Sequence, residues 1–416
     1  MNQPLRAGII GISGYGNEHY QALLHQVEKG EMQIAGATVV NRHETGEQCA
    51  KLESLGAEIF PDYQAMLARL RGKIDFCFIP TGTHLHAPMA MAALRSGAHV
   101  LVEKPLTGAI QYALAMQSCE LETGRRIAVG YNHIYSPSTW QFKEMLGKLL
   151  GRVTHVKAAR LGSRLDNYYR RNGWAGCLRA GDSWILDSPF NNACAHELNL
   201  LCFLAGNTAN ESASIANVQA ELYRGNHLIE SADTACMRIV TGSGIKLYFY
   251  TTHCFNGRYD RALEVHGERG VIAWHEGKAF FTAAGRPRAE VKMAIGIATT
   301  DEIVEQVKRK IAGKDAFFCD TKMAAAQTIC ANGAHASSLI HPVPREAVRR
   351  RPQQESVRTE ILGIDDAMQR AFQEAKLLSE INVPWAKPGA AVSMKEYRCF
   401  SGGAAGNQAP ALHPKK

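Results

Sequence analysis

The sequence predicts an α/β protein with an N-terminal doubly wound parallel sheet and a C-terminal α+β domain whose large open sheet is mainly antiparallel. The first third alternates short apolar runs with helical patterns, which is typical of βαβ units. Later stretches are β-branched and alternate in polarity, which favours antiparallel strands. The length of 416 residues also exceeds what one core usually spans. We expect domains at 1–133 and 134–395, and a flexible tail at 396–416.

Five apolar runs supply the strands of the first domain, and their continuous apolar character predicts burial on both faces. The runs are 5–11, 34–40, 73–80, 99–102 and 126–130. Helical patterns at 19–28, 87–94 and 109–122 lie between them. In the second domain we expect strands within 152–160 and 234–252, and helices at 196–204, 301–311 and 363–381.

The composition is that of an ordinary globular protein, with 46% hydrophobic and 21% charged residues. A net charge of +8 suits anionic small molecules, and no nucleic-acid-binding motif is present. The basic run at 345–351, REAVRRR, is interpreted as a solvated surface segment. Eleven cysteines contain no CxxC pair, so we expect no metal site and a reducing compartment. No apolar run is long enough to span a bilayer, so a cytoplasmic location without a membrane partner is expected.

A glycine-rich loop follows the first strand and opens a helix. It reads Gly11-Ile12-Ser13-Gly14-Tyr15-Gly16. Glycines permit a tight turn and close approach of a pyrophosphate, and the helix N-terminus presents N–H groups to it. The spacing is GxxGxG rather than GxGxxG, so a tight turn without a ligand is the alternative. The βαβ context favours a dinucleotide-binding Rossmann domain.

The end of the second strand indicates which dinucleotide binds. An acidic residue there usually accepts hydrogen bonds from the ribose 2′-OH of NAD. This chain has Asn41 followed by Arg42, and a guanidinium can pair with a 2′-phosphate. The cofactor is therefore NAD or NADP, with NADP favoured. The alternative is that Arg42 is an exposed loop residue and Asn41 accommodates NAD.

Several segments in order along nearly the whole chain resemble the Gfo/Idh/MocA oxidoreductase family. They include LVEKPL around residue 104, VGYNHIYSP at 129–137, and NNACAHELNLLCFLAG, which contains His196. Each segment is a weak match by itself, whereas the ordered set is specific. The resemblance implies a Rossmann domain joined to an α/β domain with a large open sheet. It also implies a homodimer or homotetramer formed through that sheet.

The resemblance assigns catalytic roles to Lys104 and His196. Lys104 matches the lysine of the family's EKP motif, which lies between the nicotinamide and the substrate, often before a cis-proline. His196 matches the histidine of a D-x-G-x-H motif and is suited to be the base. Asn192 replaces the aspartate of that motif and can only hydrogen-bond or orient. A surface lysine and a buried structural histidine are the alternatives.

The remaining site residues are also implied by the resemblance. Cofactor contacts are expected from Pro80, Thr81, Gly82, His84, Glu103, Lys104 and Asn132. Substrate contacts are expected from Tyr131, Tyr168, Arg171, Trp174, Asn192 and His196. The aromatic and basic group at 168–174 could equally be an ordered loop or a subunit contact. His253 is either a further cleft residue or an outward-facing strand histidine.

The resulting expectation is an NAD(P)-dependent oxidoreductase that transfers hydride between a nicotinamide and a sugar, cyclitol or similar polyhydroxylated molecule. Two alternatives stay open. One is an NAD-dependent glycosidase that oxidises the sugar transiently and eliminates the aglycone. The other is a non-catalytic regulator that senses a dinucleotide or sugar.

Overall fold

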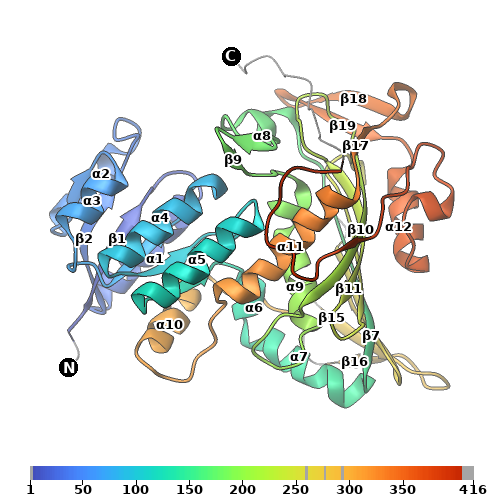
Figure 1. Cartoon of the computed structure of the whole chain (residues 1–416), viewed down its shortest axis with the longest axis horizontal. Coiled ribbons are helices and arrows are strands. Elements are labelled where there is room, and N and C mark those ends of the chain that lie inside the picture. The colour runs from blue at the N-terminus through green and yellow to red at the C-terminus, as the bar shows by residue number, and fades with distance from the viewer. Residues whose placement is uncertain (1–2, 258–260, 276–277, 292–294, 405–416) are drawn as a thin grey trace. The chain divides into compact units, whose positions relative to one another are not determined.

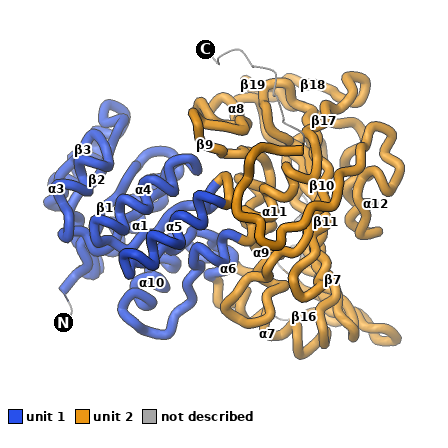
Figure 2. The backbone as a smooth tube through the Cα atoms, viewed as in Figure 1, with its two compact units in different colours: residues 1–107, 111–135, 297–325 blue, residues 108–110, 136–296, 326–416 orange. Residues whose placement is uncertain are grey.

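The structure, a computed structural model, describes residues 3–257, 261–275, 278–291 and 295–404. The chain divides into two compact units (Figure 2). Unit 1 comprises residues 1–107, 111–135 and 297–325, and unit 2 comprises 108–110, 136–296 and 326–416. The units are not continuous in sequence as the expected domains were, because residues 108–110 belong to unit 2 and residues 297–325 return to unit 1.

Unit 1 contains a parallel sheet of six strands among the described residues, in the order β3-β2-β1-β4-β5-β6. The strands are β1 (Leu5–Ile10), β2 (Met32–Thr38), β3 (Glu58–Phe60), β4 (Phe76–Ile79), β5 (His99–Val102) and β6 (Ile127–Val129). The strand order reverses between β1 and β4, and this reversal is the switch point at which ligands bind in open α/β sheets. The predicted doubly wound parallel sheet is confirmed.

Helices cover this sheet, which explains why its central strands are apolar throughout (Figure 1). Every residue of β4 is buried, Phe76 and Phe78 completely. The helices are α1 (Gly16–Glu28), α2 (Gly46–Ser54), α3 (Tyr63–Arg69), α4 (Thr83–Ser96), α5 (Ile110–Thr123), α6 (Asn132–Tyr135) and α10 (Thr300–Ile311). The sequence analysis omitted α2, β3 and α3, which are short elements with little apolar periodicity.

Helix α10 belongs to unit 1 because it packs against α1. The Gln26 amide donates to Asp301 at 2.7 Å and to Glu305 at 2.8 Å. A capping box between Thr299 and Glu302 fixes the start of α10. The helix predicted at 301–311 is thus present, but in the nucleotide-binding unit.

Unit 2 is built on a ten-stranded sheet, counted over the described residues, in the order β16-β15-β14-β13-β7-β12-β11-β10-β17, with β20 paired to β10. Its strands are β7 (Val153–Leu161), β10 (Ile215–Arg224), β11 (Thr234–Thr241), β12 (Lys246–Thr252), β13 (Arg261–Gly267), β14 (Gly270–His275), β15 (Lys278–Thr282), β16 (Ala289–Val291), β17 (Ile340–Pro342) and β20 (Val392–Ser393). Among the described strand pairs of this sheet, β7–β12 and β10–β17 are the parallel ones. The mainly antiparallel sheet is confirmed.

Helices lie on both sides of this sheet (Figure 1). They are α7 (Pro137–Leu150), α8 (Asp166–Arg170), α9 (Ala195–Leu204), α11 (Thr321–Ser337) and α12 (Ile364–Glu374). Helix α9 contacts β7 and β12 from one side, and α12 contacts the same strands from the other. Tyr248 and Tyr250 of β12 pack in one apolar cluster with Met368 and Phe372 of α12. The chain itself therefore covers part of the sheet through which a homodimer or homotetramer was expected to form, and the homo-oligomer stays a prediction.

The helix predicted at 363–381 is shorter than expected. It ends at Glu374 because Ala375 adopts a left-handed conformation with φ of 53°. The N–H of Lys376 then bonds back to the carbonyl of Ala371, which closes the helix end. A short 3₁₀ turn, Ser379–Ile381, follows separately.

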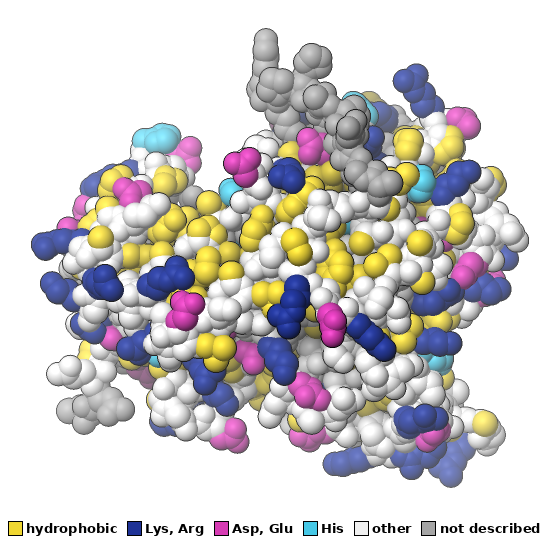
Figure 3. Space-filling model, in the orientation of Figure 1, with side chains coloured by type: hydrophobic (Ala, Val, Ile, Leu, Met, Phe, Trp, Pro, Cys, Tyr) yellow, Lys and Arg dark blue, Asp and Glu magenta, His cyan; other side chains and the backbone are white. Residues whose placement is uncertain are grey.

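The basic run at 345–351 is not simply a solvated segment. It forms part of a hairpin of β18 (Val348–Gln353) and β19 (Ser356–Ile361). The Arg350 guanidinium pairs with the buried carboxylate of Asp166, and Arg351 pairs with Glu360 at 3.1 Å. On the face shown in Figure 3, Lys and Arg side chains are interspersed with Asp and Glu.

Part of the predicted flexible tail is packed. Phe400 is 1% exposed, and its ring meets Trp184 at a centroid distance of 5.0 Å. Residues 405–416 lie outside the described part of the chain. None of the described helices is long and apolar enough to cross a membrane.

The ion pair between Arg350 and Asp166 yields a stability prediction. Asp166 is 1% exposed. Without the guanidinium, its carboxylate would still accept the hydrogen bond from the Asn226 amide at 3.2 Å but would lose its charged partner. The Arg350 side chain is one-third exposed, so Arg350→Gln is expected to lower the free energy of unfolding by about 2 kcal/mol, less than for a fully buried pair. Urea unfolding measures this loss, and adding Asp166→Asn should recover part of it.

The matched control is Arg349→Gln in the same strand, because Arg349 is exposed. It should change stability by less than about 0.5 kcal/mol. Equal stabilities of the two arginine variants would show that the Asp166 pair contributes nothing to the fold.

Candidate functional site

The loop after β1 has the geometry of a phosphate-binding turn. Gly11 and Gly14 have φ of 92° and 57°, values that favour glycine. A Cβ on Gly16 would lie 2.9 Å from the Gly11 carbonyl oxygen. The N–H groups of Ser13, Gly14 and Tyr15 have no acceptor among the described residues. Together with the N-terminus of α1, they form a cradle suited to an anionic pyrophosphate.

The loop after β4 lies beside this cradle. A Cβ on Gly16 would be 3.5 Å from Pro80, and one on Gly11 would be 3.7 Å from Thr81. Gly82 then caps the start of α4. The structure therefore brings the predicted glycine loop and the predicted 80–84 loop together at the switch point of the sheet.

The contacts at the end of β2 do not match the argument for NADP. The Arg42 guanidinium pairs with Glu53 at 2.6 Å. The Asn41 amide donates to Glu44 at 2.7 Å and to Ser13 at 3.2 Å. A carboxylate beside Asn41 disfavours a 2′-phosphate by like-charge repulsion. The sequence analysis did not single out Glu44, although it lies only three residues after Asn41.

The loop after β5 carries Glu103, Lys104 and Pro105, and the cis peptide implied by the resemblance is present between Lys104 and Pro105. Glu103 accepts a hydrogen bond from His19 Nε2 of α1 at 2.8 Å and one from the Lys104 N–H at 3.0 Å. Burial alone would raise the pKa of Glu103, but the hydrogen bond from His19 and the nearby positive charges lower it below its ordinary value. The carboxylate therefore stays charged at neutral pH.

A second buried histidine holds the same loop from α4. His86 is fully buried, with Nδ1 2.9 Å from the Pro105 carbonyl oxygen and Nε2 3.0 Å from the Thr81 carbonyl oxygen. Burial lowers the pKa of His86, although both carbonyls favour its charged form. The ring thus ties the loop after β4 to the loop after β5. Neither His19 nor His86 was predicted as a site residue.

The residues after β6 complete the nucleotide-binding half of the site. Tyr131 is fully buried. Asn132 begins α6, and its buried Oδ1 atom has no hydrogen-bond partner in the part of the chain described. His84 lies in the first turn of α4, and burial lowers its pKa. An orphaned amide oxygen and an open phosphate cradle on one edge of the sheet fit a bound dinucleotide.

Unit 2 holds the predicted histidine in the first turn of α9. His196 lies two residues after Cys194, which is the N-cap residue of this helix. The Asn192 amide donates to Asp187 at 2.7 Å. Asp187 is buried and also accepts a hydrogen bond from the Gly176 N–H at 2.6 Å. Asp187 therefore places a buried carboxylate beside Asn192, and the sequence analysis did not single it out.

The predicted aromatic and basic residues gather around the same carboxylate. The Arg171 guanidinium lies 3.7 Å from the centroid of the Tyr168 ring and 5.3 Å from that of Trp174. It is also 3.9 Å from Asp187. Four predicted substrate residues, Tyr168, Arg171, Trp174 and Asn192, thus belong to one network in unit 2.

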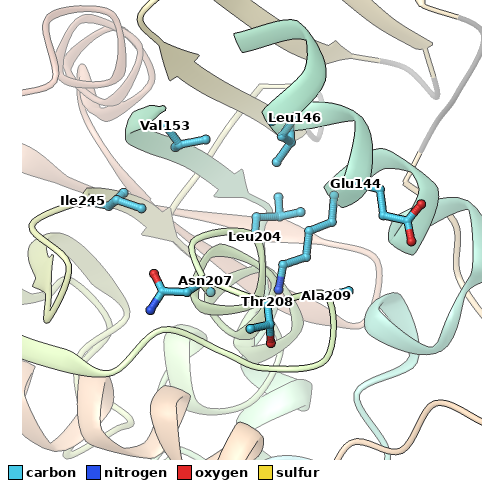
Figure 4. A pocket seen from close by; sticks show the side chains of 11 residues that line it. Glu144, Leu146, Val153, Leu204, Asn207, Thr208, Ala209 and Ile245 are labelled. Carbon is cyan, nitrogen blue, oxygen red and sulfur yellow. The ribbon is translucent and has the colours of Figure 1, made fainter. Parts of the chain in front are cut away.

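A separate cavity of about 310 Å³ lies elsewhere in unit 2 (Figure 4). Apolar side chains such as Leu146, Val153 and Ile245 line it opposite the loop that contains Asn207. Lys143 also lines it, donates to the Glu211 carbonyl at 2.8 Å and lies 4.0 Å above the Phe203 ring. Burial lowers the pKa of Lys143 from 10.5 to about 8. Lys143 stabilises the loop after α9, and none of the predicted site residues lines this cavity.

The fold and the nucleotide half define an oxidoreductase with a dinucleotide-binding Rossmann domain. Residues 5–131 match the profile described as "Oxidoreductase family, NAD-binding Rossmann fold". Residues 141–273 match the profile described as "GFO/IDH/MocA C-terminal domain". The chain belongs to the Gfo/Idh/MocA oxidoreductase family, as the resemblance implied.

Two curated relatives are inositol dehydrogenases. An inositol 2-dehydrogenase/D-chiro-inositol 3-dehydrogenase of Halalkalibacterium halodurans is 25% identical over 65% of this chain and 72% of its own length. The inositol 2-dehydrogenase of Paracoccus denitrificans is 23% identical over 68% and 77%, respectively.

Two solved structures share the fold at lower identity. The WlbA dehydrogenase from Bordetella pertussis, in complex with NADH and UDP-GlcNAcA, has a TM-score of 0.65 and 19% identity, covering 80% of this chain and 96% of its own. A levoglucosan dehydrogenase in complex with NADH has a TM-score of 0.65 and 18% identity, with the same coverage of both chains. At these identities the comparison establishes the fold.

The glycine cradle yields a prediction on cofactor binding. Gly16→Ala places a methyl group 2.9 Å from the Gly11 carbonyl, so the loop must open. NADH affinity, measured by nicotinamide fluorescence, should fall at least about tenfold, the equivalent of one lost hydrogen bond to a charged group. Gly147→Ala is the control, because a Cβ there meets open space. An unchanged affinity of the Gly16 variant would show that this loop does not bind the pyrophosphate.

The depressed pKa of Lys143 yields a pH prediction. The folded pKa of about 8 is below the unfolded value of 10.5, so the unfolded chain binds more protons between these values and stability rises with pH in that window. Lys143→Met should remove this contribution, which urea midpoints at pH 7, 8, 9 and 10 would detect. Lys148→Met, exposed in the same helix, should keep the wild-type slope. The same slope in all three proteins would contradict the prediction.

Proposed function

We propose that this chain catalyses NAD(P)-dependent hydride transfer at a CH–OH group of a sugar, cyclitol or similar polyhydroxylated small molecule. The observation that carries the proposal is the position of Lys104. Its loop follows β5, on the same edge of the parallel sheet as the glycine cradle after β1. His19 and His86 hold this loop from two helices. A lysine so fixed at the ligand-binding edge is suited to act on a substrate oxygen.

The nucleotide half has a role for most of the predicted cofactor residues, with Arg42 the exception. The loop from Gly11 to Gly16, with Ser13, Gly14 and Tyr15, would hold the pyrophosphate through its N–H groups. Asn41 would contact the adenosine ribose. The residues that follow β4 and β6, from Pro80 to His84 and Asn132, would hold the nicotinamide end. Bound NAD(P) supplies the acceptor or donor of the hydride.

The cofactor is proposed to be NAD rather than NADP. The sequence favoured NADP through Arg42, but this guanidinium pairs with Glu53. Glu44 adds a carboxylate beside Asn41, where the 2′-phosphate of NADP would lie. Both contacts favour a neutral ribose hydroxyl at this position.

Lys104 is assigned the role of positioning and polarising the reacting oxygen. Its ammonium can donate a hydrogen bond to the hydroxyl and stabilise the negative charge that develops there. Glu103 holds the backbone of Lys104 through the N–H bond at 3.0 Å. Because the pKa of Glu103 is lowered, the carboxylate keeps this bond across the physiological pH range.

His196 is assigned the role of the base that accepts the hydroxyl proton. An imidazole is the side chain suited to proton transfer near neutral pH. Asn192 cannot carry charge, but its bond to Asp187 fixes the amide at the start of the segment that leads into α9. We assign Asp187 the role of orienting Asn192. The glycosidase alternative would be supported by NAD that copurifies and does not exchange, and the regulator alternative by binding without turnover.

The role of Lys104 is tested by Lys104→Met. Because transition-state stabilisation by one such donor contributes about 10²–10³-fold, turnover of myo-inositol or another accepted polyol should fall by at least that factor. Affinities for NADH and NADPH, measured by fluorescence titration, should stay within threefold of wild type. The same titration compares the two cofactors.

The matched control is Lys73→Met, an exposed lysine that precedes β4. It should keep wild-type turnover. If the Lys104 variant turned over an accepted substrate at the wild-type rate, the catalytic role assigned to Lys104 would be contradicted.

A further inference from the structure

A compact group of cationic and aromatic side chains lies in unit 2, and we name it the Tyr168 cluster. It comprises Arg164, Tyr168, Arg171 and His253. The guanidinium carbons of Arg164 and Arg171 lie 5.2 Å and 3.7 Å from the centroid of the Tyr168 ring. The His253 ring meets Tyr168 edge-on at 5.8 Å. One tyrosine thus holds two guanidinium groups and one imidazole close together.

The positive charge of this cluster is only partly balanced by the Asp187 carboxylate. Asp187 is 3.9 Å from Arg171 and is already engaged by the Gly176 N–H and the Asn192 amide. No ion pair of Arg164 is found within the described ranges. The neighbouring Arg160, by contrast, pairs with Glu197 at 3.2 Å. The cluster therefore carries about one positive charge more than its acids supply.

His253 adds a buried polar atom without a partner. It is 4% exposed, and its Nδ1 atom lies 3.0 Å from the Tyr169 hydroxyl. Its Nε2 atom is buried and makes no hydrogen bond to any described residue. Burial, and then the charges of Arg164 and Arg171, lower the pKa of His253 well below its ordinary value. When the Tyr169 hydroxyl donates to Nδ1, the neutral ring presents a spare Nε2–H donor.

The cluster is connected to the proposed site. Asp187 joins Arg171 to Asn192. Burial raises the pKa of the Cys194 thiol to about 12, and the charge of Arg164 acts against this rise. Arg164 is thus near the residue that caps α9, two positions before His196. A ligand group at the cluster would therefore lie near the start of this helix.

We infer that the substrate of the proposed dehydrogenase is a sugar or cyclitol bearing an anionic group, which Arg164 and Arg171 bind while His253 donates a hydrogen bond to it. This inference rests on the proposed function. Carboxylate and phosphate share the required chemistry, because both accept charge-assisted hydrogen bonds from guanidinium groups. A neutral polyol would leave the charge and the buried Nε2–H uncompensated.

The experiment is calorimetric titration of the full-length protein, saturated with NADH, at low salt. The probes are D-glucuronate, D-glucose 6-phosphate and D-glucose. At least one anionic probe should bind ten times or more tighter than glucose, since a hydrogen bond to a charged group contributes roughly tenfold or more. Binding of glucuronate alone identifies a carboxylate, and binding of the phosphate alone identifies a phosphoryl group.

Variants connect this preference to the cluster. Arg164→Gln and Arg171→Gln should each reduce the ratio of the affinity for the anionic probe to the affinity for glucose about tenfold. Arg164→Lys keeps the charge and should retain part of the preference. Arg170→Gln, an exposed arginine in α8, is the matched control and should bind like wild type. Thermal unfolding of each variant identifies any that fails to fold.

The outcomes separate this inference from the proposed function. Equal affinities for all three probes, or equal losses in the Arg164 and Arg170 variants, would overturn the inference. Binding of an anionic probe that depends on Arg164, but without NAD reduction by any polyol or sugar acid, would support anion binding at the Tyr168 cluster and contradict the proposed function. Turnover of myo-inositol that is independent of Arg164 and faster than turnover of any sugar acid would support the proposed function and overturn the inference.

Discussion

The parallel alignment of β1, β4, β5 and β6 is the constraint on which the nucleotide half of this protein depends. Because parallel strands share one carboxyl edge, the loops after them must emerge side by side. The glycine cradle follows β1, and the loop bearing Lys104 follows β5. Strand pairing places these loops but does not fix their conformation. His86, with a carbonyl of each neighbouring loop against its two ring nitrogens, supplies that fixation.

Buried polar groups in both units are held by specific partners, and this determines where charge is available. Glu103 is surrounded by donors, so its pKa falls despite burial. Asp187 accepts bonds from a backbone N–H and the Asn192 amide. Each carboxylate orients a neighbour that is proposed to contact substrate, and neither needs to touch the reacting atoms. The loss of the motif aspartate at Asn192 is thus compatible with an ordered site, because Asp187, five residues earlier, holds the Asn192 amide.

The sequence was sufficient for features encoded locally and insufficient for those that depend on distant partners. The apolar run at 99–102 predicted β5 to the residue, and the glycine spacing predicted the cradle. The end of α12 was missed, because a left-handed Ala375 has no sequence signature. His19 and Glu103 are 84 residues apart, so neither residue type suggests their pairing. Asp187 and Glu44 lie near predicted residues, but acidic side chains in loops are too common to be selected without coordinates.

Arg160, Lys143 and the Tyr168 cluster differ in how their positive charge is compensated, and this difference explains why, of these three sites, the cluster indicates a ligand. Arg160 has its own carboxylate, Glu197. Lys143 lacks one, but a carbonyl and the Phe203 ring surround its ammonium, and burial lowers its pKa toward the neutral form. Arginine cannot shed its charge in this way, so the excess charge of the Tyr168 cluster must be met by solvent or by an anion. The orphaned Nε2 atom of His253 is buried away from solvent, and an anionic ligand satisfies both requirements at once.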